Sequence, residues 1–234
     1  MIEALKVTWQ SLKGFWEDFV LLVTLDLIWS LSVLLMIVPI FLLGSTSPLP
    51  ALALSFLLFW PLPIISAALC FVTSEIARGK AVGWGAFPIG LRRYWRKGLI
   101  VALINLVVLG LIAANIQFYG FVLEGAWTNF AVSAWIVIGL YWLIAQIYWF
   151  PMILELESEK TLVALRNALA LVIISPGFSL VLAVLLFLLA AVCILLTVPA
   201  PLIMAGLLLL ISNHATQNRL AMIRRKREAR ERDE

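Results

Sequence analysis

The chain has 234 residues, of which 64% are hydrophobic and 13% are charged, and its formal net charge is +4. Soluble domains contain about 45–50% apolar residues, so this composition excludes an ordinary soluble protein. Several apolar runs reach the ~20 residues that cross a bilayer. Because backbone groups in lipid must be hydrogen-bonded within their own element, we predict an all-α polytopic membrane protein.

Residues 1–18 are predicted to form an amphipathic helix at the membrane interface. Its apolar residues recur at spacings of three and four, so they share one helical face. They are Ile2, Leu5, Trp9, Leu12 and Trp16. Tryptophans beside lysines are typical of a helix that lies in the interface plane. The alternative is a helix packed on other protein helices. The segment lacks the apolar h-region and cleavage site of a signal peptide.

Six membrane spans are predicted in a membrane domain of residues 19–218. They cover residues 19–43, 51–76, 98–118, 129–154, 175–197 and 202–212, the last continuing toward 218. Pro61 and Pro63 remove two backbone donors from the second span and are expected to kink it or open it locally. Because the last span is short, the alternative is five spans and a re-entrant segment.

Two connections are predicted to contain amphipathic elbow segments on the membrane surface. Residues 78–97 carry six positive charges and no negative charge. The second elbow, before Ser175, has an apolar stripe at helical spacing. The stripe consists of Leu162, Leu165, Leu169 and Val172.

The basic residues predict the orientation of the chain. All seventeen Lys and Arg residues lie in residues 1–18, these two elbows and a charged tail of residues 219–234. The other three connections contain none. Six crossings place every basic segment on one side, which the positive-inside rule makes cytoplasmic. Both termini are therefore predicted to be cytoplasmic.

Two basic clusters are expected to face anionic lipid headgroups. They are Arg92, Arg93, Arg96 and Lys97 in the first elbow, and Arg224, Arg225, Lys226 and Arg227 in the tail. The lipid bilayer is thus the expected partner of both clusters. Nucleic-acid binding is not expected, because the chain has no stacking or groove-reading module.

Three polar residues form a predicted intramembrane layer. Asp26, Asn105 and Gln146 each lie about eight residues from an expected cytoplasmic span end, which corresponds to a depth of ~12 Å. One interpretation is hydrogen bonding between helices, with Asp26 paired to Asn105 or Gln146. The other is a site for a polar substrate or a proton. Ser30 and Ser66 are candidates for the same layer.

No residue pattern predicts catalysis, a cofactor or a metal. The chain has no HExxH, CxxC or clustered Asp/His motif. His214 has polar neighbours near the end of the last span, which favours a structural role. Cys70 and Cys193 are expected at different depths and so remain free, buried thiols.

Four segments together resemble the YesL-type family of bacterial integral membrane proteins. They are TLDLIWSL, PLPIISAALCFVTSEIARGK, FPIGLRRYWRKGLIVALIN and YWFPMILELESEKTLVALRNALALVIISP, within about residues 19–185. The family's first-span polar residue is usually asparagine, whereas this chain has Asp26. Family members are often encoded near sugar-uptake genes, and their biochemical role is not established. The resemblance implies a multi-pass protein of the bacterial cytoplasmic (inner) membrane.

Two functions are compatible with these patterns. The spans contain few polar groups, which favours a non-enzymatic scaffold or accessory subunit of a partner membrane complex, linked to solute (sugar) uptake by the resemblance. Its partner would be another membrane protein or a second copy of the chain. The alternative is a small transporter or channel-like protein with a polar site in the inner leaflet.

Overall fold

The computed structural model describes residues 2–123, 125, 127–156 and 160–233, and within these residues every regular element is a helix. The predicted all-α class is confirmed. In chain order the elements are α1 (Ile2–Glu17), α2 (Phe19–Leu43), α3 (Pro48–Phe59), α4 (Pro61–Ala77), α5 (Ala86–Gln117), the π-helix η1 (Phe118–Val122), α6 (Thr128–Glu155), α7 (Thr161–Ile174), α8 (Pro176–Leu195) and α9 (Pro199–Asp233).

Within the residues that the structure describes, six helical stretches are long and apolar enough to cross a membrane, so the protein is a multi-pass membrane protein. They are Phe19–Leu43, Pro48–Ala77, Ala86–Val122, Thr128–Glu155, Pro176–Leu195 and Pro199–Arg225. The last stretch has 27 residues, and at 1.5 Å per residue it is ~40 Å long, more than the ~30 Å hydrocarbon core. The expected short last span is therefore part of a helix long enough to cross the membrane, which favours six spans over five with a re-entrant segment.

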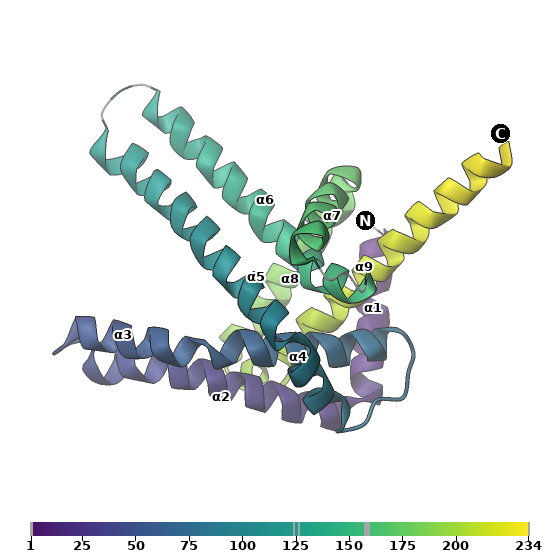
Figure 1. The fold of residues 1–234 in the computed structure, drawn as a ribbon, viewed down its shortest axis with the longest axis horizontal. Helices are drawn as coiled ribbons and strands as arrows, with labels where there is room; N and C mark the ends of the chain where they lie inside the picture. Colours follow the sequence, from purple (N-terminus) through teal and green to yellow (C-terminus); the bar gives the residue numbers. More distant parts are fainter. Residues whose placement is uncertain (1, 124, 126, 157–159, 234) are drawn as a thin grey trace.

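The helix of the second span is opened locally at Trp60, where one turn residue with helical dihedral angles separates α3 from α4. α3 ends at Phe59 and α4 begins at Pro61, with Trp60 as a turn between them. Proline lacks the backbone N–H that would continue the hydrogen-bond ladder. α3 then pairs with α2 as one hairpin (Figure 1).

The third span begins earlier than predicted. α5 starts at Ala86, whereas the span was expected to start at Gly98. The basic cluster of residues 92–97 therefore lies on the first turns of the spanning helix itself. Lys and Arg are good helix formers, so the helix continues through the basic cluster. The charges mark the part of α5 that is more polar than the rest of the helix, and they do not mark where the helix begins.

Two glycines let α5 pack closely on α4. A Cβ atom at Gly98 would lie 2.6 Å from the carbonyl oxygen of Pro63, and one at Gly90 would lie 2.9 Å from Phe71. Small residues commonly permit such close approach between membrane helices. Beyond Gly98, α5 leaves α4 and pairs with α6 in a second hairpin, which diverges from the α2–α3 hairpin (Figure 1).

α9 is the central helix of the fold. It contacts α1, α2, α4, α6 and α8, and half of its most apolar 18-residue window is buried. Leu207, Leu210, Ile211 and Ala215 of α9 belong to the main hydrophobic core. The predicted tail is continuous with this helix, and Figure 1 shows its C-terminal turns projecting away from the other helices.

α1 has one exposed face and one buried face. Trp9 and Trp16 are 61% and 72% exposed, so the predicted tryptophan face is open to the surroundings. The opposite face, which includes Val7 and Phe15, packs into the main core. The side chain of Ile2 lies outside the described residues. α1 is thus anchored on protein while its predicted interfacial face remains available to lipid.

The second predicted elbow is α7, which packs along α6. The hydroxyl of Tyr141 donates to the carbonyl of Leu169 at 2.7 Å, and the indole of Trp149 donates to the carbonyl of Thr161 at 3.2 Å. In the predicted stripe, Leu165 and Leu169 pack against the core, whereas Leu162 is 65% exposed.

Candidate functional site

Two of the three predicted intramembrane polar residues bind each other. Asn105 on α5 donates through Nδ2 to Oε1 of Gln146 on α6, at 3.0 Å. The indole of Trp142 donates to Oδ1 of Asn105 at 2.9 Å, and Gln146 donates back to the carbonyl of Trp142 at 3.3 Å. The α5–α6 hairpin therefore contains a closed amide–indole network, and its polar groups are paired within the protein.

Asp26 on α2 is bonded to α9 and not to the α5–α6 hairpin. Its carboxyl oxygen Oδ1 accepts a 2.7 Å hydrogen bond from the backbone N–H of Gly206 on α9. The side chain is fully buried, and Oδ2 has no hydrogen-bond partner within the described residues. The expected bond to Asn105 or Gln146 is not among the described hydrogen bonds, so the predicted layer separates into two sites.

Gly206 is what allows the approach of Asp26. A Cβ atom at this position would lie 3.0 Å from Oδ1 and 3.3 Å from Oδ2 of Asp26. A larger residue would push the carboxyl group away. No polar side chain of α9 takes part in this contact, so the sequence offered little to identify it.

The two serine candidates join α2 to its neighbours. Ser66 on α4 accepts a 2.9 Å hydrogen bond from the indole of Trp29 on α2. Ser30 donates to the carbonyl of Pro201 on α9 at 3.2 Å. These contacts are those expected of hydrogen bonding between helices.

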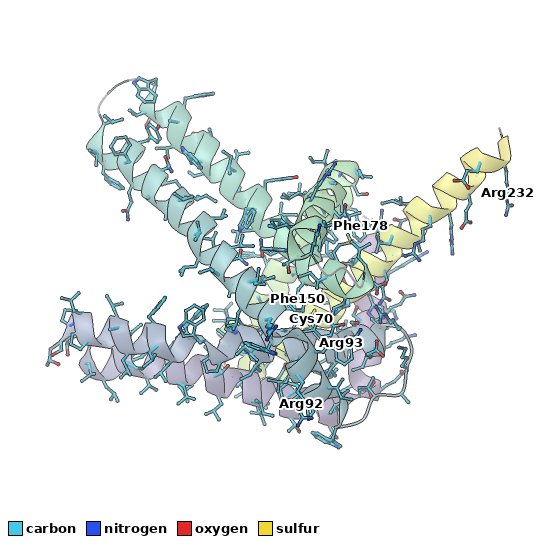
Figure 2. All side chains as sticks on the ribbon, viewed as in Figure 1. Cys70, Arg92, Arg93, Phe150, Phe178 and Arg232 are labelled. Carbon is cyan, nitrogen blue, oxygen red and sulfur yellow. The ribbon has the colours of Figure 1, made fainter. Side chains whose placement is uncertain are left out.

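A cavity of 660 Å³ lies between α4 and α5, where the two hairpins diverge. Its walls are almost entirely apolar, with the side chains of Ser66 and Asn105 as exceptions. Cys70 and Phe150, both labelled in Figure 2, line the cavity and belong to one small hydrophobic cluster. Since both polar side chains are already bonded, the cavity suits an apolar molecule and not a polar solute.

A charged network fastens the ends of α4 and α6 together. The guanidinium of Arg78 bonds Glu75 at 2.8 Å and Glu155 at 3.2 Å, and Lys80 also bonds Glu75. Gln217 of α9 donates to Glu155 at 3.0 Å. Burial alone would lower the pKa of Arg78, but the carboxylates of Glu155 and Glu75 outweigh it and raise that pKa. The network therefore favours a fixed geometry for three helices.

Arg219 leaves the predicted tail and enters the core, which sequence reasoning missed. It is 4% exposed, pairs with Glu3 of α1, and its guanidinium carbon lies 3.7 Å from the ring centroid of Phe178 on α8. The hydrogen bond from Arg219 lowers the pKa of the Glu3 carboxyl. The only signal in the sequence is its position, directly after the last apolar span.

The predicted lipid-facing cations occupy two places. Arg92, Arg93 and Arg96 are exposed on α5, and the guanidinium of Arg96 lies 5.1 Å from the Trp95 ring centroid. Within the described chain, these three arginines form no ion pair with an acid. Lys97 is half-buried and lies over the ring of Tyr94.

In the second cluster, Arg224 and Arg225 are exposed on α9. The side chains of Lys226 and Arg227 lie outside the described residues. Figure 2 shows Arg232 farther along the projecting part of the same helix.

The remaining candidate residues have structural contacts. His214 Nδ1 lies 2.9 Å from the hydroxyl of Ser11, but that hydroxyl is fully buried and donates to the carbonyl of Val7. Ser11 and His214 thus join α1 to α9. Cys70 and Cys193 are free and buried. Among the described residues, no group of three or more His, Cys, Asp or Glu could hold a metal ion.

No family model, curated protein or solved structure matches this chain. Its function is therefore inferred from its own residues and their geometry.

Proposed function

We propose that this protein is a non-enzymatic scaffold or accessory subunit of a partner membrane complex. The observation that carries this proposal is the α5–α6 hairpin. In the most apolar 18-residue segment of each span, 6% of the residues are buried in α5 and 11% in α6. The corresponding fraction in α9 is 50%. A hairpin with so little support from its own protein suits contact with a second membrane protein.

The polar groups within the spans support a binding role over transport. Asn105, Gln146 and Trp142 bond one another, and Ser66 bonds Trp29. A carrier of polar solutes needs polar groups that can exchange protein partners for substrate. The link to solute (sugar) uptake, and membership of the YesL-type family, come from the sequence resemblance and belong to this proposal.

The proposed location is the bacterial cytoplasmic membrane with both termini in the cytoplasm. The distribution of Lys and Arg over alternate connections supports this orientation through the positive-inside rule. The same orientation puts the Arg78 network and both lipid-facing basic clusters at the cytoplasmic surface.

Co-purification in native lipid tests the proposal. The protein, extracted in polymer-bounded membrane discs, should carry a second membrane protein, or a second copy of itself, in fixed stoichiometry. Changing Leu111, Phe130 and Val137 on the hairpin to alanine should release that partner. Phe41→Ala on α2 is the matched control, because Phe41 and Phe130 are similarly exposed, at 82% and 78%. Absence of any stoichiometric partner would overturn the proposal.

One observation favours the alternative of a small transporter. The Oδ2 atom of Asp26 is buried without a partner among the described residues, and unsatisfied ionisable groups inside membranes often bind ions or protons. Purified protein in liposomes should then conduct solute or proton flux by itself. Such flux, lost in Asp26→Asn, would replace the scaffold proposal with this one.

A further inference from the structure

The cavity between α4 and α5 is open to the surrounding membrane. Leu106 and Leu109 line it and are 48% and 40% exposed, and Gly110 is also exposed. On α5 the lining runs from Gly98 to Ala113, an axial length of ~22 Å at 1.5 Å per residue. This length exceeds the ~15 Å depth of one leaflet, so an extended hydrocarbon chain fits along it.

The basic cluster lies at one end of this cavity. Lys97 immediately precedes Gly98, the first lining residue of α5. Arg92 precedes the lining residues Leu106 and Gly110 by about four and five helical turns, and Arg96 precedes Gly110 by about four turns, so both arginines lie on the Gly110 edge of the cavity. An apolar channel therefore ends at exposed guanidinium groups.

The exposed arginines point to the charge of the occupant. Arg92 and Arg96 form no ion pair among the described residues, and guanidinium groups bind phosphate oxygens in two-point contacts. Trp95 lies between them in sequence and is 40% exposed, and tryptophan is enriched at the headgroup level of membranes.

We propose that this cavity binds one acyl chain of an anionic glycerophospholipid, with the lipid phosphate held by Arg92 and Arg96. The acyl chain would cover the side of α5 that no described helix of this protein covers. The phosphate would form ion pairs with the guanidinium groups of Arg92 and Arg96. The inference goes beyond the scaffold proposal and requires only that the chain spans a membrane.

Native mass spectrometry of the purified protein tests the site. The probes are palmitoyl-oleoyl phosphatidylglycerol, phosphatidylcholine with the same chains, and glycerol phosphate, which has no chain. We expect at least a severalfold preference for phosphatidylglycerol over phosphatidylcholine, and no competition from glycerol phosphate. Equal retention of the two lipids, or effective competition by glycerol phosphate, would contradict the proposal.

Two pairs of variants separate this site from general lipid binding. Arg92→Gln with Arg96→Gln should lower phosphatidylglycerol retention by about fivefold for each charge, whereas Arg224→Gln with Arg225→Gln on the tail should not.

Gly110→Leu should fill the cavity, because a Cβ atom there meets no atom within 4 Å, and should reduce retention. Gly177→Leu, at an exposed glycine of α8 with equally open space, is its control.

The variant pairs also give results that would refute the site. Loss of lipid to the same extent in the tail variant as in the Arg92 and Arg96 variant would show a diffuse charge effect. Unchanged retention in Gly110→Leu would show that the acyl chain lies elsewhere.

Discussion

Asp26 can distinguish the two interpretations of the polar residues in the spans, which are hydrogen bonding between helices and a site for a polar substrate or a proton. It accepts one hydrogen bond, from the backbone of Gly206, and leaves its second oxygen without a described partner. An asparagine can accept the same bond through its own Oδ1. The bond itself therefore does not require a carboxyl group.

Asp26→Asn is expected to leave stability and function nearly unchanged. Asp26→Leu removes the acceptor and should destabilise the fold by about 1 kcal/mol, the usual scale of a hydrogen bond between membrane helices. Thermal unfolding in detergent, together with partner co-purification, measures both effects. If Asp26→Asn kept its stability but lost function, a titrating carboxyl group would be required, and the transporter alternative would gain support.

At the scale of helices, α4 and α5 depend on the absence of a side chain at Gly98. A Cβ atom there would meet the backbone of Pro63 at 2.6 Å, and a backbone atom cannot move aside without shifting its helix. Gly98→Ala should therefore cost about 1–3 kcal/mol as an overpacked contact.

Gly110→Ala on the same helix provides the control, since a Cβ atom there has open space. It should be neutral or slightly stabilising, because alanine is the better helix former. Unfolding midpoints of the two variants in one detergent give the comparison. Equal midpoints would mean that the α4–α5 contact contributes little to the fold.

The docking of α1 should depend on pH through Glu3. The pKa of Glu3 is lowered from its ordinary value of 4.5 by its hydrogen bond from Arg219. An acid with a lowered pKa stabilises the fold above its unfolded pKa, and this contribution is lost as the pH falls through the folded value. Glu3→Gln should therefore reduce the unfolding midpoint near neutral pH and have progressively less effect on acidification.

Glu17→Gln, at the other end of α1, is the control for this effect. Glu17 is exposed and forms no ion pair among the described residues. A constant difference between wild type and Glu3→Gln across the acid range would show that the ion pair with Arg219 does not stabilise α1.

For the molecule as a whole, the six spans could be predicted because each apolar run is a local property of the sequence. The start of α5 could not, because Arg92–Lys97 change polarity without breaking the helix. The Asp26–Gly206 hydrogen bond could not be predicted either, because its donor is a backbone N–H, which every residue except proline has. Depth along a span can be counted from sequence, but which helix a side chain faces depends on packing. Asn105 and Gln146 could be placed at one depth and lie on the two helices of one hairpin, so they form a hydrogen bond. Arg219 and Glu3 come from opposite ends of the chain, and nothing local in the sequence indicates their ion pair.

The orientation of the whole chain is the last prediction, and it follows from basic residues confined to alternate connections. In a variant with Cys70 and Cys193 replaced by serine, single cysteines at Ser45 and Thr197 should react with a membrane-impermeant thiol reagent added to intact cells. Both positions are exposed and lie in connections without basic residues. Cysteines at Lys80 and Arg224 should react only after the cells are permeabilised, which also shows that these thiols are accessible. Reaction of Lys80→Cys from outside intact cells would reverse the orientation. The Arg78 network and the arginines at the mouth of the cavity would then face the outer surface, and the proposed anionic lipid would have to come from the outer leaflet.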